Sequence, residues 1–155
     1  MKVLVVYDSR TGNTGLMAEA VAQGVMDSGI EAVLKTVDEA SIDELPQVHG
    51  VIFGSPVYYG LPTGRIKEWI DKTVKYHGKL THLVAGAFCS AGSSGYESTI
   101  LALLEACLVH GMIVQGNSQG SHYGVVSIGA PGEKEIENCK KLGARVSELI
   151  KKLHP

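Results

Sequence analysis

The sequence predicts an α/β fold in which a doubly wound parallel sheet is covered by helices on both faces. Three observations lead to this prediction: the apolar runs are short and β-branched, helical patterns separate them, and the two alternate five times. Such alternation requires right-handed crossovers between parallel strands. The runs typical of strands are KVLVVY (2–7), AVLKTV (32–37), GVIFGS (50–55), HLVAGAFC (82–89) and GMIVQG (111–116).

The first, third and fourth runs show little polar alternation, as expected for strands that are buried on both faces. Between the runs, apolar residues at helical spacing mark the buried faces of helices. Three of these faces comprise Met17, Val21 and Val25; Ile66, Trp69, Ile70 and Val74; and Ile100, Leu103, Leu104, Cys107 and Leu108. We expect a fourth helix over 133–153 and a short helix around Ser41–Leu45.

The composition predicts a single domain spanning 1–155. Sixteen acidic and 14 basic residues give a net charge of −2, which argues against the clustered basic surface of a nucleic-acid-binding protein. No apolar run approaches the roughly 20 residues that span a bilayer. The cysteines, Cys89, Cys107 and Cys139, form no CxxC motif, and the chain enters a strand without a signal-peptide pattern. We therefore expect free thiols and a cytoplasmic location.

Polar residues fill the loop between the first strand and the first helix. The loop SRTGNT comprises Ser9, Arg10, Thr11, Gly12, Asn13 and Thr14. Backbone N–H groups and the positive end of the helix dipole converge there, so the loop is expected to bind an anion such as a phosphate monoester. Arg10 either reaches that phosphate or faces solvent. The alternative is that these side chains only cap the helix, but one cap requires one such residue.

Two more loops follow the third and fourth strands and are expected at the same edge of the sheet. In SPVYYG, Pro56 fixes a turn, Gly60 permits unusual backbone angles, and Tyr58 or Tyr59 offers an aromatic plate for a flat ring. The alternative is that both tyrosines pack on the next helix. In SAGSSGY, small residues allow backbone N–H groups to approach a planar ligand. They are Ser90, Ala91, Gly92, Ser93, Ser94 and Gly95.

A phosphate loop, an aromatic plate and a rim poor in side chains match flavin mononucleotide (FMN) better than a bare phosphate. The first loop carries neither GxxxxGK[ST] nor GxGxxG, so the fingerprints of nucleoside-triphosphate and dinucleotide sites are absent. A phosphate-accepting receiver domain would need clustered acidic residues after the first strand and a lysine after the fifth. Asp8 stands alone, and 111–130 contains no lysine.

The three loops, in this order and spacing, resemble the flavodoxin-like superfamily. The stretches FGSPVYYGLPTGRIKEWIDKT (53–73), HGMIV (110–114) and SHYGVVSIGAPGEKE (121–135) are similar to NAD(P)H:quinone oxidoreductases of the WrbA type. The resemblance implies a five-stranded parallel sheet in the order 2-1-3-4-5. It also implies that residues 9–14 bind the FMN phosphate, that Val57, Tyr58 and Tyr59 contact the flavin ring, and that residues 90–95 line its edge.

The resemblance further implies that His110 approaches the flavin, across the cleft or from a neighbouring subunit, as the candidate catalytic residue. From the residues alone, a histidine at a helix end is more often a cap on the last carbonyl groups of the helix. His122 and Tyr123 are weaker candidates for closing the site. The chain departs from these relatives in two shortened segments, VKYHGKLTH (74–82) and VDEASIDELPQVH (37–49). In the relatives the first of these segments helps to build the substrate pocket and a tetramer.

These features predict a flavoprotein that takes two electrons from NAD(P)H and passes them to a quinone or similar acceptor, and that can form a homo-oligomer. The first alternative is a flavodoxin-type one-electron carrier, although such carriers usually meet their partners through an acidic surface that this chain lacks. The second alternative is a module without enzymatic activity that binds a protein partner.

Overall fold

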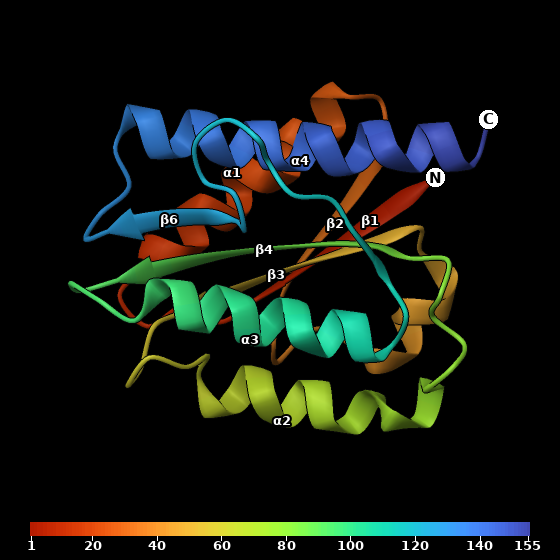
Figure 1. Cartoon of the computed structure of the whole chain (residues 1–155), viewed down its shortest axis with the longest axis horizontal. Coiled ribbons are helices and arrows are strands. Elements are labelled where there is room, and N and C mark those ends of the chain that lie inside the picture. Colours follow the sequence, from red (N-terminus) through yellow and green to blue (C-terminus); the bar gives the residue numbers. More distant parts are fainter.

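A computed structural model describes all residues, 1–155, and has the predicted alternation of strands and helices (Figure 1). The elements are β1 (Lys2–Tyr7), α1 (Asn13–Asp27), β2 (Glu31–Thr36), η1 (Ile42–Gln47), β3 (Gly50–Pro56), α2 (Gly64–Lys72), η2 (Thr73–Tyr76), β4 (Val84–Ala91), α3 (Tyr96–Val109), β5 (Ile113–Val114), β6 (Val125–Ile128) and α4 (Glu133–Leu153). No helix is both long enough and apolar enough to cross a membrane.

The sheet is parallel throughout and follows the order β2-β1-β3-β4-β5, which confirms the predicted fold. Helices α1 and α4 cover one face, and α2 and α3 cover the other (Figure 1). Each face has its own apolar core, one of them centred on Ile66, Leu103 and Phe53 and the other on Val21, Phe88 and Val146. Strands β1, β3 and β4 are buried nearly throughout, as their continuous apolar runs predict.

The fifth position of the sheet differs from the prediction, because two short strands share it. Strand β5 pairs with Val84 and Ala85 at the start of β4, and β6 pairs with 88–91 at its end. The chain between them, 115–124, leaves the sheet and crosses in front of α4 (Figure 1). The predicted strand 111–116 is therefore reduced to two residues, because Gly111 adopts a φ of 75° and the Asn117 N–H donates to the His122 carbonyl within the loop instead of to β4.

Candidate functional site

The three candidate loops lie together at the carboxyl edge of the sheet. In the strand register Tyr7 is opposite Gly54, and Pro56 is opposite Ser90, so β1, β3 and β4 end side by side. A short bond also joins the second and third loops, where the Val57 N–H donates to the Ser90 carbonyl at 2.8 Å. The structure therefore confirms the prediction that these three loops lie at one edge of the sheet.

The first loop presents a row of free backbone donors. Gly12 adopts a φ of 95° and precedes α1, which has no side-chain cap at that residue. The N–H groups of 10–14 donate to no acceptor in the protein. The only capping contact is the bond from the Gly15 N–H to Ser9 Oγ at 3.2 Å. Capping thus accounts for Ser9 alone, and five consecutive donors at a helix N-terminus remain available to an anion.

Thr14 connects this first loop to the end of β4. Its Oγ1 lies 2.7 Å from Ser90 Oγ, and both residues are buried. Thr11 is exposed and Asn13 is half-buried, and neither side chain bonds to the protein. The loop therefore has an anchored inner hydroxyl and free outer polar groups.

The second loop is a tight turn that exposes both tyrosines. Tyr58 and Leu61 exchange two backbone hydrogen bonds of 3.0 Å, and the central residues Tyr59 and Gly60 adopt φ values of 52° and 73°. Positive φ at both central positions is the requirement of a type I′ turn, and it is unfavourable for tyrosine. Tyr59 is the only residue other than glycine with positive φ, and its side chain is fully exposed. Neither tyrosine is buried against α2.

Arg10 does not extend freely into solvent, although it is exposed. Its guanidinium carbon lies 5.3 Å from the centroid of the Tyr58 ring, within the range of a cation–π contact. The contact joins the first and second loops. The predicted contact of Arg10 with a bound phosphate stays a prediction.

The third loop approaches the second one closely. A Cβ atom added to Gly95 would lie 2.7 Å from the Gly60 Cα, and Gly95 itself has a φ of 78°. The Ser98 hydroxyl donates to the Gly60 carbonyl at 2.8 Å and fixes the turn from the first turn of α3. Gly92, Ser93 and Ser94 are exposed, and no atom lies within 4 Å of a Cβ built on Gly92. The rim is therefore as open as the sequence predicts.

A buried carboxylate beneath the loops was not assigned any role from the sequence. Asp8 is 2% exposed and accepts a bond from Thr63 Oγ1 and another from Arg65 Nη1, each at 2.8 Å. The Arg65 guanidinium also pairs with Asp38, and both carboxylates raise the pKa of Arg65. Asp8 thus ties the end of β1 to the start of α2, where Thr63 caps the helix. The separation of 57 residues between Asp8 and Arg65 hides this pair from motif analysis.

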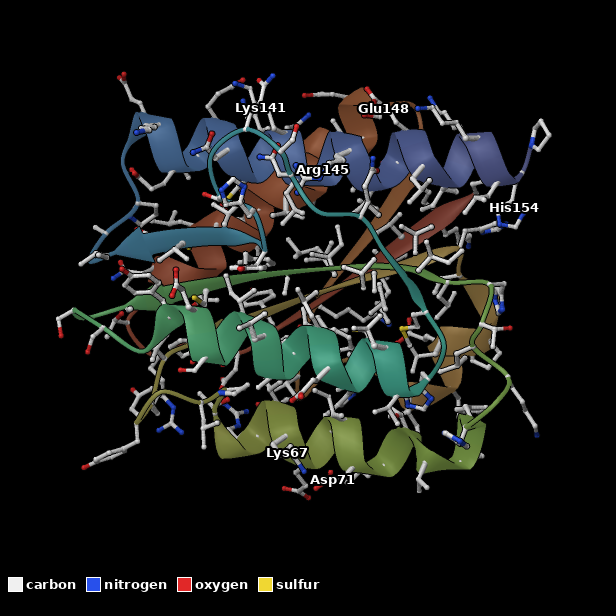
Figure 2. The ribbon with its side chains drawn as sticks, viewed as in Figure 1. Lys67, Asp71, Lys141, Arg145, Glu148 and His154 are labelled. Atoms are coloured by element: carbon white, nitrogen blue, oxygen red, sulfur yellow. The ribbon has the colours of Figure 1, made fainter.

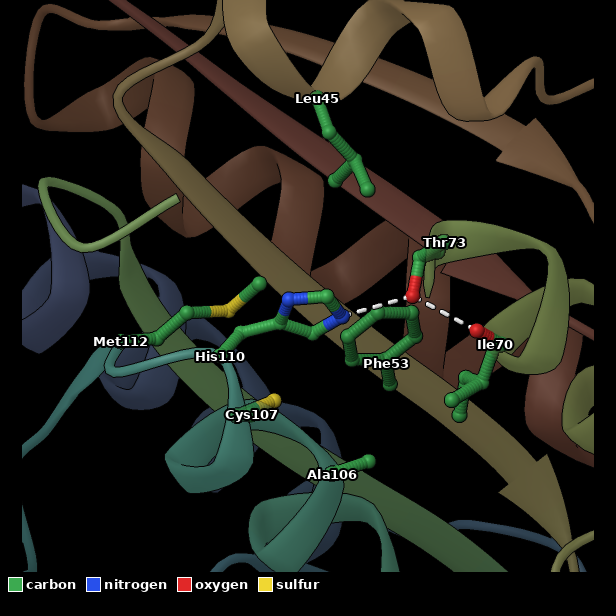
Figure 3. Close-up of a pocket in the computed structure, with 8 residues that line it drawn as sticks. All are labelled: Leu45, Phe53, Ile70, Thr73, Ala106, Cys107, His110 and Met112. Carbon is green, nitrogen blue, oxygen red and sulfur yellow. Dashed lines mark hydrogen bonds between the residues drawn. The ribbon is translucent and has the colours of Figure 1, made fainter. Parts of the chain in front are cut away.

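His110 lies at the opposite edge of the sheet. His110 directly follows α3, and this helix runs from the three loops towards the opposite edge of the sheet. His110 also precedes β5, which pairs with the start of β4. Its Nε2 lies 2.7 Å from Thr73 Oγ1 in a small apolar pocket, and its buried Nδ1 has no partner (Figure 3). Burial, and then the neighbouring His77, lower the pKa of His110. The structure therefore does not bring His110 to the three loops of its own chain.

The three cysteines are free and buried. Burial raises the pKa of Cys89, Cys107 and Cys139 to about 12 in each case. They are therefore protonated thiols that fill the core, including Cys89 beside the third loop.

The chain matches the flavodoxin family model over residues 5–146 and belongs to this FMN-binding family. A protein named flavodoxin from Aquifex aeolicus (strain VF5) is 37% identical over 160 residues, which cover 96% of this chain and 86% of that protein. A protein named NAD(P)H dehydrogenase (quinone) from Archaeoglobus fulgidus is 32% identical over 188 residues, which cover 98% of each chain. Because this chain has 155 residues, the second alignment contains inserted segments that the chain lacks.

The fold is also that of a solved structure, a flavodoxin, WrbA-like protein from Agrobacterium tumefaciens. The two superpose with a TM-score of 0.82 at 27% identity, over 97% of this chain and 98% of that one. The likeness to the flavodoxin-like superfamily and to the WrbA type, stated from the sequence, is thereby confirmed.

Proposed function

We propose that the three loops of the carboxyl edge bind FMN and that the protein is an electron-transfer flavoprotein of the flavodoxin type. The observation that carries the proposal is the row of unpartnered N–H groups at 10–14. Five donors at a helix N-terminus suit the several acceptor oxygens of a phosphate monoester. Ser9, Thr11 and Asn13 add neutral polar groups, so the phosphate is held without a dedicated cation.

The second and third loops suit the flavin ring. Tyr58 and Tyr59 are exposed aromatic surfaces beside the loop that binds the phosphate, and Gly92 leaves open space at the rim. Small residues at 90–95 let backbone donors approach the polar edge of the ring. Arg10, held beside Tyr58, is positioned between the phosphate loop and the ring surface. Pro56, Val57 and Gly60 shape the turn that carries the tyrosines.

FMN, when bound, supplies the redox chemistry, because its ring accepts one or two electrons. Three features of this chain favour a carrier over an NAD(P)H-dependent reductase. His110, the candidate catalytic residue of the reductase, lies at the far edge of the sheet from the three loops of its own chain. The 74–82 connection lacks the segment that helps to build the substrate pocket in the relatives it resembles. The Tyr59–Gly60 peptide lies in an exposed turn where a glycine makes reorientation easy.

NAD(P)H:quinone reduction is the second candidate, and the Archaeoglobus relative supports it. That relative carries the name NAD(P)H dehydrogenase (quinone) and aligns with 98% of this chain. In this case a neighbouring subunit of a homo-oligomer would have to complete the pocket. NAD(P)H would then be the donor and a quinone the acceptor.

Anaerobic reduction distinguishes the two candidates. The protein is saturated with FMN and titrated with NADH, NADPH and finally dithionite while the visible spectrum is recorded. The carrier is supported if both nicotinamides leave the flavin oxidised and dithionite reduces it in two separate stages. Complete bleaching by NADH or NADPH in one stage would instead favour the reductase. Absence of bound flavin after saturation would overturn the FMN proposal itself.

A further inference from the structure

The loop that splits the fifth strand forms a second pocket with α4, away from the three loops. The cavity measures about 560 Å³ and lies between 117–121 and one face of α4. Figure 2 shows Lys141 and Arg145 on α4, at the place where this loop crosses the helix. The volume falls within the range of small-molecule sites. None of the loop residues 9–14, 56–60 and 90–95 lines this pocket.

The pocket is basic, although the whole chain has a net charge of −2. Lys134, Lys141 and Arg145 line it, and no carboxylate does. Positions 134, 138, 141 and 145 follow helical spacing, so they share one face of α4. Lys141 is 3.8 Å from Glu137, but both side chains are more than half exposed, so this pair neutralises little charge.

Arg145 carries the strongest sign of a missing partner. Its Nε is buried and has no hydrogen-bond acceptor, and the residue forms no salt bridge. Burial also lowers the pKa of Arg145. Glu148, one turn along α4, is exposed and does not line the pocket. A buried N–H of a guanidinium group without an acceptor is rare in native proteins and calls for an explanation.

The loop 117–121 presents further hydrogen-bond donors to the pocket, on the side opposite α4. The Asn117 N–H donates to the His122 carbonyl at 3.0 Å, and His122 Nδ1 lies 2.7 Å from the Asn117 carbonyl, so the loop is closed on itself. The Gln119 N–H donates to Asn117 Oδ1 at 3.1 Å. With its oxygen used in this way, the Asn117 side chain keeps its NH₂ group for another acceptor. Asn138 adds a second amide from α4.

We propose that this pocket binds a small molecule that carries a phosphate group with two or more negative charges. Three cations neutralise such a group, and the planar Arg145 guanidinium with the neutral amide donors matches its several oxygens. A single carboxylate offers only two oxygens and one charge. The site is independent of the FMN loops, so one chain holds two phosphate groups at separate places.

Inorganic pyrophosphate is the probe that tests the site. The protein is first saturated with FMN, which fills the N–H groups of 10–14, and is then titrated at constant ionic strength while ¹H–¹⁵N NMR spectra are recorded. We expect the Nε–Hε signal of Arg145 and the side-chain amide signals of Asn117 and Asn138 to move together. Lys141→Gln and Arg145→Gln each weaken binding by about tenfold, as expected for a charge-assisted hydrogen bond. Acetate, a single carboxylate, should bind more weakly than pyrophosphate.

Lys67→Gln is the matched control, because Lys67 is also an exposed helical lysine with an i,i+4 carboxylate, Asp71, on the other face of the sheet (Figure 2). It should leave the pyrophosphate affinity within about twofold of the original. Equal weakening by Lys67→Gln and Lys141→Gln, or shifts spread over all surface lysines, would overturn the proposal. So would unchanged Arg145 and Asn117 signals at about 1 mM pyrophosphate, or acetate that binds as tightly as pyrophosphate. If Arg145→Gln does not fold, the pyrophosphate affinities of Lys141→Gln and of the original protein are compared, and they test the proposal without it.

Discussion

The hydroxyl groups of Thr14 and Ser90 lie 2.7 Å apart, although 76 residues separate them in the sequence. Thr14 belongs to the first turn of α1 and Ser90 to the end of β4, so this bond fixes the first loop relative to the third. Both side chains are buried, with exposed fractions of 1% and 7%. The phosphate and ring portions of the proposed FMN site are therefore joined through a hydrogen bond that water does not reach.

Thr14→Val tests this connection, because valine keeps the shape and removes the hydroxyl. The Ser90 hydroxyl is left buried without its partner, so we expect a loss of about 1–2 kcal/mol in the free energy of unfolding. FMN affinity should fall by about tenfold as the two loops lose their fixed distance. Urea unfolding and FMN fluorescence quenching measure the two effects. Thr14→Ser retains the hydroxyl but loses a buried methyl group, so it should lose about 1 kcal/mol in stability and keep its FMN affinity. An equal loss of FMN affinity in both variants would contradict the account.

Gly95→Ala tests the close approach of the second and third loops. The added Cβ would lie 2.7 Å from the Gly60 Cα, and alanine is strained at a φ of 78°. We expect a loss of about 2 kcal/mol in stability and weaker FMN binding. Gly78→Ala is the control, because Gly78 has a φ of 77° but no atom lies near its added Cβ. The control variant introduces the same backbone strain without the close contact. An equal loss of FMN affinity in both variants would therefore contradict the role proposed for the contact between the second and third loops.

The Asp8–Arg65 pair predicts a measurable coupling energy. Arg65→Gln leaves the buried Asp8 carboxylate with Thr63 as its remaining side-chain donor. Because Arg65 is 41% exposed, we expect a loss of about 1–2 kcal/mol rather than the larger loss of a fully buried pair. A double-mutant cycle with Asp8→Asn, followed by urea unfolding, gives the coupling. Lys67→Gln breaks an exposed pair and should change stability by less than about 0.5 kcal/mol. A coupling near zero for Asp8 and Arg65 would refute this account.

His110 predicts a loss of stability at acidic pH. Burial and His77 lower its pKa below the ordinary value of 6.5, so the folded state holds the neutral ring. Below about pH 6.5 the unfolded chain binds a proton that the folded chain does not, and the free energy of unfolding decreases as the pH falls. His110→Gln should flatten this part of the profile, measured by urea unfolding between pH 7.5 and pH 5. An identical slope in the His110 variant would disprove the assignment.

The sequence was sufficient for the fold because buried parallel strands are continuous apolar runs. KVLVVY, GVIFGS and the run ending at Cys89 lie where they were predicted, within two residues at each boundary. The fifth strand was harder, because β5 retains only Ile113 and Val114 and β6 is a four-residue run, Val125–Ile128, inside a region rich in turn residues. Both strands depend on pairing with β4, which a local pattern does not contain.

The candidate site shows the same limit. Three loops could be placed at one edge because parallel strands share their direction. His110 was associated with them through resemblance, yet α3 begins at that edge and, at about 1.5 Å per residue, carries the chain roughly 20 Å away. The pairing of Asp8 with Arg65 is a tertiary contact between segments 57 residues apart. The positive φ of Tyr59 belongs to a local turn, but tyrosine is not a residue that favours this conformation. The Asp8–Arg65 pair has no signature in the residues around it, whereas Gly60 indicated the turn but not the conformation of Tyr59.

Comparison of FMN with riboflavin, which lacks the phosphate, tests the central claim most directly. Both flavins are titrated into the flavin-free protein, and their dissociation constants are measured by calorimetry. If the N–H groups of 10–14 hold the phosphate, FMN should bind at least about a hundredfold more tightly than riboflavin, since several charge-assisted bonds are lost with the phosphate. Equal affinities for the two flavins, or no binding of FMN, would contradict the assignment of this loop.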